Sequence, residues 1–441
     1  MILDEESNLN IVLHLYVRIT ARNYNDFPVA DRFENRNMRI KLLIVLTIGL
    51  LFPFVIVVGQ NPDVIKNGLA LTPPMGWSSW NTFKKNPTEA VIKQTADAMV
   101  ASGLKDAGYV YVNVDDFWST GRDTNGKIIV DTAKFPGGMK ALADYIHSKG
   151  LKAGIYTNIG SKANYPTLAS GGYYQQDMNT FAEWGYDYVK VDVNFAPVRT
   201  AAAYKKEFMA IAKAILNTGR PMVFSICNQG GRDYQSWAPY IGNSWRVGPD
   251  IDHTPKEKSQ WDGVLYELNL SAAYPEIAGP GHWNDADMML VGVGSDNGRL
   301  TVMNPEEMRS HFSMWCMIAS PLMLGNDLRS VSKEVLSILT NKGAIAINQD
   351  SLGMQGTLAY EQAPGLQVWT KKLKSISGKN YAVALFNKSE NPARMALDFN
   401  RLKLNGHHKI RDVWSHKNLG NFSNNYSCDV PSHGVKLLLI E

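Results

Sequence analysis

The sequence predicts an α/β protein, a (β/α)8 barrel of the TIM type followed by a C-terminal antiparallel β-sandwich. Between residues 70 and 350, short runs rich in aromatic and β-branched residues alternate with helical runs, which favours a parallel sheet covered by helices. Eight such repeats within about 285 residues fit a closed barrel better than an open sheet. After Gly353, short strands separated by turn residues take over, which is typical of an all-β sandwich.

The barrel is expected to span residues 66–355 and the sandwich residues 356–441. Helical runs with one apolar face occur at residues 89–102, 138–149 and 200–216. Residues 72–81 are expected to form a turn leading into the first short barrel strand, and the other barrel strands are expected at 109–116, 151–157, 186–193, 222–227 and 241–246, before Asp287, and at 320–325. The sandwich strands are expected at residues 366–370, 380–386, 393–399, 410–414 and 434–440.

The composition is that of an ordinary globular protein, with 441 residues, 45% hydrophobic and 20% charged. The formal net charge is +4 and the basic residues are scattered, so no nucleic-acid surface is predicted. Cys227, Cys316 and Cys428 lie far apart and match no metal spacing, so we expect free thiols. The 11 Trp and 19 Tyr residues can cover sugar rings as well as fill a core.

The N-terminal region contains a signal-like segment. Residues 38–59 combine a basic start, an apolar run of about 18 residues and small residues near Gly59, as in a secretory signal peptide, although this length also allows a membrane anchor. Residues 1–37 show no sustained periodicity and read as a non-native upstream extension before an initiator at Met38. We therefore expect export, to the periplasm or outside the cell, with the signal cleaved.

Polar side chains are predicted at the C-terminal ends of the barrel strands, where such barrels place their active sites. Lys190 and Asp192 stand two residues apart in an apolar strand and so point to the same face. They are either a buried salt bridge or a nucleophilic carboxylate held ionised by an ammonium group. The other polar or aromatic residues expected there are Trp80, Asp115, Asp116, Tyr156, Arg246, Asp250 and Asp287.

This group of residues favours carbohydrate chemistry. A single strand-end Asp is often only a helix cap, but five carboxylates with two cations at one mouth require a ligand rich in hydroxyl groups. No histidine accompanies the acids at ligand spacing, His253 being the nearest, so neither a metal nor another cofactor is expected. Excess negative charge and the lack of a glycine-rich loop count against phosphate. Two carboxylates on different loops suffice for glycosidic cleavage.

The chain from about residue 67 to its end resembles glycoside hydrolase family 27, the α-galactosidases and α-N-acetylgalactosaminidases. The motifs that carry the resemblance are Met75-Gly-Trp-Ser-Ser-Trp-Asn81, Asp115-Asp-Phe-Trp118, Gly154-Ile-Tyr156, Lys190-Val-Asp192, Ser244-Trp-Arg-Val-Gly-Pro-Asp-Ile251, Gly279-Pro-Gly-His-Trp-Asn-Asp-Ala-Asp-Met288, Ser320-Pro-Leu-Met-Leu-Gly-Asn-Asp327 and Ala346-Ile-Asn-Gln-Asp350. The resemblance implies a retaining exo-glycosidase that releases terminal α-D-galactosyl residues by double displacement.

The resemblance also implies a role for each matching residue. Asp192 is expected to be the nucleophile and Asp250 the general acid and base. Asp115 and Asp116 are expected to bind the 4- and 6-hydroxyls of galactose, Trp80 to lie against the ring, Lys190 to serve the 3- and 4-hydroxyls and Arg246 the 2-hydroxyl, while Tyr156, Asp287 and Met288 line the pocket. The expected partners are galactose-containing oligosaccharides, polysaccharides or glycoconjugates.

The chain departs from the family pattern in several places. Where many members carry Cys-Glu-Trp, it has Cys227-Asn-Gln-Gly-Gly231, so Asn228 is expected near the sugar 2-position. Phe117 and Asn194 replace family cysteines, so the family's disulfides are missing.

Three alternatives to α-galactosidase activity stay open. They are α-N-acetylgalactosaminidase activity, β-L-arabinopyranosidase activity, and a catalytically silent carbohydrate-binding barrel. The intact Asp115-Asp116 pair counts against the second, because activity on arabinopyranose would favour a bulkier acid there. The presence of both Asp192 and Asp250 counts against the third.

Overall fold

The computed structural model describes residues 67–160, 168–196, 199–231, 233–255, 257–295, 297–374 and 380–441. The predicted signal segment and upstream extension, residues 1–59, lie outside the described residues. Within these ranges no helix is both long and apolar enough to span a bilayer. Cys227, Cys316 and Cys428 are free thiols, as predicted.

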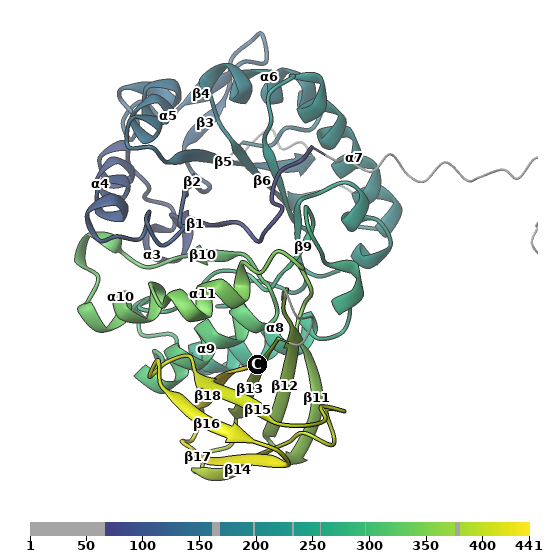
Figure 1. Ribbon diagram of the computed structural model, residues 1–441. Coiled ribbons are helices and arrows are strands. Elements are labelled where there is room, and N and C mark those ends of the chain that lie inside the picture. Colours follow the sequence, from purple (N-terminus) through teal and green to yellow (C-terminus); the bar gives the residue numbers. More distant parts are fainter. Residues whose placement is uncertain are drawn as a thin grey trace, which may run out of the picture. The chain divides into compact units, whose positions relative to one another are not determined.

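The first part of the described chain is an eight-stranded parallel sheet surrounded by helices (Figure 1). The strands pair in the order β10-β1-β2-β5-β6-β7-β8-β9. Their bounds are β1 Met75–Ser78, β2 Tyr111–Val114, β5 Lys152–Gly160, β6 Tyr188–Phe195, β7 Val223–Cys227, β8 Ser244–Arg246, β9 Trp283–Asp285 and β10 Leu322–Leu324.

A single bridge after β9 links the two ends of this sheet. The Met289 N–H donates to the Met323 carbonyl at 2.7 Å, and the Gly325 N–H donates to the Met289 carbonyl at 3.2 Å. The predicted α/β barrel class is therefore confirmed, with β9 and β10 joined through Met289 and not by direct strand pairing.

Several of the helices around the sheet begin at side-chain caps, although α3, α5 and α6 do not. Thr88 and Thr200 cap α4 and α7, and Ser259 and Asn304 form capping boxes at α8 and α9, each worth about 1 kcal/mol. The helices are α3 Trp80–Phe83, α4 Glu89–Ala101, α5 Gly138–Ser148, α6 Tyr174–Trp184, α7 Ala201–Asn217, α8 Gln260–Ser271, α9 Pro305–Met317, α10 Lys333–Leu339 and α11 Lys342–Asn348.

An antiparallel hairpin, which was not predicted, interrupts the alternation of strands and helices. Strands β3 (Ser119–Arg122) and β4 (Ile128–Val130) follow β2 and pair only with each other. Their turn contains Asn125-Gly126, a dipeptide that favours tight hairpin turns.

The C-terminal part is antiparallel, as predicted. A six-stranded sheet runs β11-β12-β13-β18-β15-β16, and β14 pairs with β17 in a second sheet. The strands are β11 Thr357–Ala363, β12 Leu366–Lys372, β13 Tyr381–Asn387, β14 Ala393–Asp398, β15 His408–Asp412, β16 Asn418–Phe422, β17 Asn425–Val430 and β18 Val435–Ile440. Strands β11, β16 and β17 were not predicted.

The central strands of the larger sheet are buried on both faces, and alternate side chains of each strand enter different cores. In β13, Val383 and Leu385 join the core of the sandwich, whereas Ala384 and Phe386 join the core of the barrel. The Trp414 indole also donates to the Ser313 hydroxyl on α9 at 3.0 Å. The sandwich therefore contributes to the packing behind the barrel helices, away from the strand ends described next.

Candidate active site

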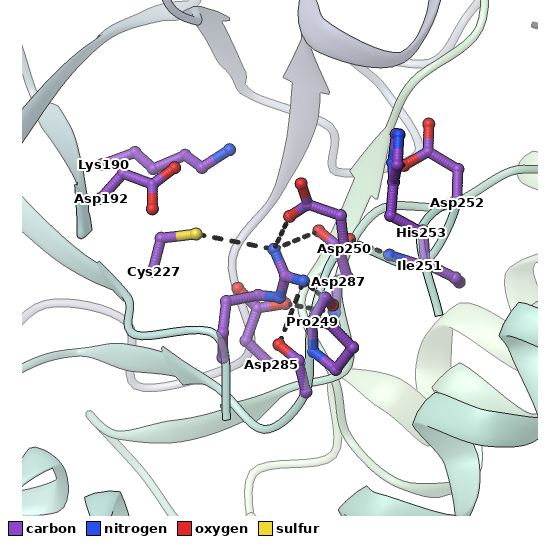
Figure 2. Close-up of polar contacts among 12 residues, drawn as sticks. Lys190, Asp192, Cys227, Pro249, Asp250, Ile251, Asp252, His253, Asp285 and Asp287 are labelled. Atoms are coloured by element: carbon purple, nitrogen blue, oxygen red, sulfur yellow. Dashed lines mark hydrogen bonds and ion pairs between the residues drawn. The ribbon is translucent and has the colours of Figure 1, made fainter. Parts of the chain in front are cut away.

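Most predicted site residues lie at or just after the C-terminal ends of barrel strands, whereas Tyr156, Lys190 and Asp192 lie within β5 and β6. Parallel strands place these ends at one side of the sheet, so residues distant in sequence come together. Figure 2 shows Lys190, Asp192 and Cys227 facing the same space as Asp250 and Asp287. None of the five predicted carboxylates caps a described helix; the caps are other residues. The helix-cap alternative is therefore wrong.

Asp192 is buried on β6, and both of its carboxylate oxygens are held. Oδ1 accepts from the Val193 N–H at 2.7 Å, and Oδ2 accepts from the Tyr156 hydroxyl at 2.9 Å and the Asn194 amide at 3.2 Å. Burial and the nearby Asp250 raise the pKa of Asp192 above its ordinary value, although Lys190 and these hydrogen bonds lower it. The predicted effect of Lys190 on Asp192 is present, but burial and Asp250 outweigh it.

Lys190 forms a largely buried ion pair with Asp115 and not with Asp192, so the expected Lys190–Asp192 salt bridge was wrong. Its Nζ lies 2.9 Å from Asp115 Oδ2. Burial alone would lower the pKa of Lys190, but Asp115 and the neighbouring acidic groups raise it well above its ordinary value. Its ammonium group is therefore charged whenever these acids are charged.

Asp115 and Asp116 differ in their free hydrogen-bonding capacity. Asp115 accepts from the Ser78 hydroxyl at 3.0 Å and from the Asp116 N–H at 2.9 Å, in addition to Lys190. Asp116 accepts from the Phe117 N–H at 2.7 Å through one oxygen. Burial, with the charges of Asp115 and Asp192, raises the pKa of Asp116 to about 7. Asp116 can therefore donate as well as accept near neutral pH.

Aromatic rings lie beside this acidic pair. Trp80 begins α3 directly after β1, and its ring stacks with that of Phe117 at a centroid distance of 6.3 Å. Phe117 has φ +69°, in a region that L-residues seldom adopt. The sequence identified Phe117 only as a departure from the family, and its strained backbone became visible only in the structure.

Arg246 at the end of β8 contacts two other acids of the site, Asp250 and Asp287. Nη1 lies 3.1 Å from Asp250 Oδ1 and 3.0 Å from Asp287 Oδ1, contacts drawn in Figure 2. Asp287 also accepts from the Ile251 N–H at 2.8 Å, and burial raises its pKa to about 7. The Asp250 side chain is 36% exposed, so it lies at the open side of the site while Asp192 lies at its base.

Asn228 follows β7 and is 1% exposed, and neither atom of its side-chain amide has a partner among the described residues. Nearby, a Cβ at Gly230 would lie 2.1 Å from the Val247 carbonyl oxygen, whereas a Cβ at Gly231 would meet no atom within 4 Å. Met288 is also buried beside the acids. A buried amide without a partner requires a ligand or water to satisfy it.

Two buried acids behind Arg246 were missed in the sequence. Glu267 on α8 is fully buried without a hydrogen-bond partner among the described residues, and burial raises its pKa well above the usual range. Burial also raises the pKa of Asp285. No sequence pattern marks Glu267, because an acid on a helix is ordinarily assigned to its solvent-facing side.

One group of side chains among the described residues has the spacing of a metal site. Ligand atoms of Asp250, Asp252 and His253 all lie within 4.8 Å of one another. Asp252, however, already binds Lys84 at 2.7 Å and His253 at 2.9 Å. These existing ion pairs satisfy the carboxylate without a metal, so the arrangement does not require one.

Known protein families and proteins match most of this chain, including the part that carries the site. A family model described as "Alpha galactosidase A" matches residues 72–350, and one for the "Alpha galactosidase C-terminal beta sandwich domain" matches residues 363–440. A probable α-galactosidase of Dictyostelium discoideum is 43% identical over 383 residues, covering 86% of this chain and 94% of its own. Alpha-galactosidase A of Cellvibrio japonicus is 41% identical, covering 91% and 99%. The crystal structure of α-galactosidase I from Mortierella vinacea superposes with a TM-score of 0.77 at 35% identity, covering 85% and 98%.

Proposed function

The chain belongs to the α-galactosidase A family, within glycoside hydrolase family 27, and hydrolyses terminal α-galactosyl groups; from this premise we propose that Asp192 and Asp250 carry out the reaction by a two-step retaining mechanism. The observation that carries the assignment is the contrast between the two acids. Asp192 is buried with both oxygens oriented, as a nucleophile must be, whereas Asp250 lies at the open side within the electrostatic reach of Asp192.

In the first step, an Asp192 oxygen attacks the anomeric carbon of galactose while Asp250 gives its proton to the departing glycosidic oxygen. In the second step, Asp250 takes a proton from water, and this water displaces Asp192 from the anomeric carbon on the same face as the leaving group. Arg246 orients Asp250 through their 3.1 Å contact. The exposure of Asp250 gives both the leaving group and the incoming water access to it.

The remaining residues are proposed to bind the galactosyl group. Asp116 has one oxygen without a hydrogen-bond partner among the described residues, and its pKa is about 7, so it suits a sugar hydroxyl that both donates and accepts. Asp115 is already held by Lys190, so its main role is to keep that ammonium group in place. Trp80 offers an aromatic face to the ring, and galactose-containing oligosaccharides are the expected substrates.

Replacing Asp250 with Asn should reveal its role through the leaving group. We expect kcat/KM for melibiose, whose leaving sugar alcohol needs a proton, to fall about 10²-fold or more. On 2,4-dinitrophenyl α-galactoside, whose leaving group needs none, the first step should be almost unaffected. Burst kinetics on both substrates would measure this, and equal first-step losses would contradict the assignment.

The site should discriminate against substrates that carry an acetamido group in place of the 2-hydroxyl of the sugar. Asn228 offers a neutral amide, and the Gly230 backbone is packed against Val247, which limits the space for an acetamido group on that side, while the space beside Gly231 is open. We expect kcat/KM for nitrophenyl α-galactoside to exceed that for the α-N-acetylgalactosaminide at least about tenfold, equivalent to about 1.4 kcal/mol. Equal or reversed specificity constants would contradict this prediction.

We also propose that the protein is exported through the segment at residues 38–59. Support comes only from the basic start and apolar run of that segment. Intact-mass analysis of exported protein should find a chain that begins near Gln60. Recovery of residues 1–37 in the mature protein would refute this proposal.

A further inference from the structure

The loop that carries Asp250 is held from outside the galactose-binding residues by one lysine. Lys84 follows α3, and its Nζ donates to Asp252 Oδ2 at 2.7 Å. Asp252 stands two residues after Asp250 and its side chain is 8% exposed, while that of Lys84 is 24% exposed. The contact therefore joins the β1–α3 segment to the acid loop, which are 168 residues apart in sequence.

Asp252 is fixed by several further contacts. His253 Nδ1 lies 2.9 Å from Asp252 Oδ1, and Arg299 donates to the Asp252 carbonyl oxygen. Burial raises the pKa of Asp252, but Lys84 and His253 outweigh this and hold it below its ordinary value. Asp252 is thus an ionised, oriented carboxylate that forms a direct ion pair with Lys84.

Lys84 also contacts the aromatic residue on the other side. The backbone N–H of Lys84 donates to the Trp80 carbonyl at 2.8 Å, and its side-chain Nζ lies 5.6 Å from the centre of the Trp80 ring. Its backbone has φ 46° and ψ −117°, which is sparsely populated for a residue with a side chain and persists only where surrounding contacts enforce it. One residue therefore touches both Trp80 and the acid loop.

We propose that Lys84 is a positioning residue that places Asp250 for proton transfer by tying its loop, through Asp252, to the segment that presents Trp80. The inference rests on the proposed role of Asp250 as the acid. The rest of the loop is held by the Ile251 contact with Asp287 and by Arg246, and His253 and Arg299 contact Asp252. Lys84 supplies the contact that connects this loop to the segment that presents Trp80. Small misplacements of a catalytic group cost large factors in rate.

The experiment compares leaving groups in Lys84→Met. For melibiose, which needs proton donation, kcat/KM should fall at least about tenfold, because the acid loop loses its tie. For 2,4-dinitrophenyl α-galactoside, the rate of the first step should stay within about twofold, because no proton is needed. Lys84→Arg should restore most of the melibiose activity. Equal losses on both substrates would overturn the inference, because a general loss of structure affects both.

Two controls keep the result decisive. Lys140→Met removes a lysine from an exposed ion pair with Asp144, where both side chains are about 60% exposed, and should change neither rate. Lys84→Met with Asp252→Asn leaves no buried charge unpaired, so it should fold and still show the selective loss on melibiose. If Asp250→Asn shows leaving-group selectivity and the Lys84 variants do not, the inference alone fails. If Asp250→Asn also lacks it, the proposed acid is wrong.

Discussion

Replacing Asp192 with Asn should lower kcat on a nitrophenyl α-galactoside by at least about 10⁴-fold, as expected for loss of a nucleophile. Asparagine has nearly the same shape and can still accept the Val193 N–H through Oδ1. Its amide cannot form the covalent bond to the anomeric carbon. The loss should appear even with an activated leaving group, because bond formation by Asp192 precedes any need for protonation.

The same variant should not lower the melting temperature. Burial and Asp250 raise the pKa of Asp192, which means that the ionised carboxylate destabilises the folded protein. A neutral amide at this position removes the unfavourable charge. A nucleophilic Asp192 also requires that wild-type enzyme releases the α-anomer of galactose first, which proton NMR detects before mutarotation. Near wild-type turnover by the Asn variant, or initial release of the β-anomer, would refute the assignment.

The barrel class could be predicted because its signals are local. Apolar strands and amphipathic helices repeat along the chain, and the residues at strand ends follow from that register. Motif similarity added the sugar-binding roles, which remain predictions, and the structure gathers those residues at one side of the sheet. The β3–β4 hairpin could also have been found, since Asn125-Gly126 shortly before the β-branched run Ile128-Ile-Val130 is a hairpin signal.

Contacts between distant segments could not be predicted from the same patterns. Lys190 pairs with Asp115, 75 residues away, although Asp192 stands two residues along the same strand. The choice depends on how β2 and β6 lie around the barrel and on the reach of a long side chain. The burial of Glu267 on α8 likewise depends on close packing against Gly248, where a Cβ would lie 2.2 Å from the Glu267 carboxylate.

Lys190→Met should combine a loss of activity with a loss of stability that depends on pH. Removing one partner of a buried ion pair typically costs about 3–5 kcal/mol, and Asp115 is 2% exposed. Because the site would also lose the cation that orients Asp115, kcat/KM should fall about 10³-fold. Denaturant unfolding and steady-state kinetics at several pH values measure the two effects.

The direction of the pH effect follows from the acids around Lys190. Its charge lowers the pKa values of Asp116, Asp192 and Asp287, against the burial that raises them. Without that charge these pKa values rise further, so the acidic limb of the kcat/KM profile should move to higher pH, since Asp192 must be ionised. In the wild type, acids whose pKa is raised on folding lower the free energy of unfolding as pH rises from about 4 through about 7. The variant should therefore lose more stability, relative to wild type, at pH 8 than at pH 5.

A matched pair of variants separates this electrostatic effect from simple loss of packing. Lys190→Arg keeps the charge, so it should leave the acidic limb near its wild-type position even where the bulkier guanidinium lowers kcat. Lys140→Met removes an exposed lysine and should change neither stability nor the pH profile. An acidic limb that stays in place in Lys190→Met would contradict the prediction, because the pairing with Asp115 would then have no influence on the ionisation of the catalytic carboxylates.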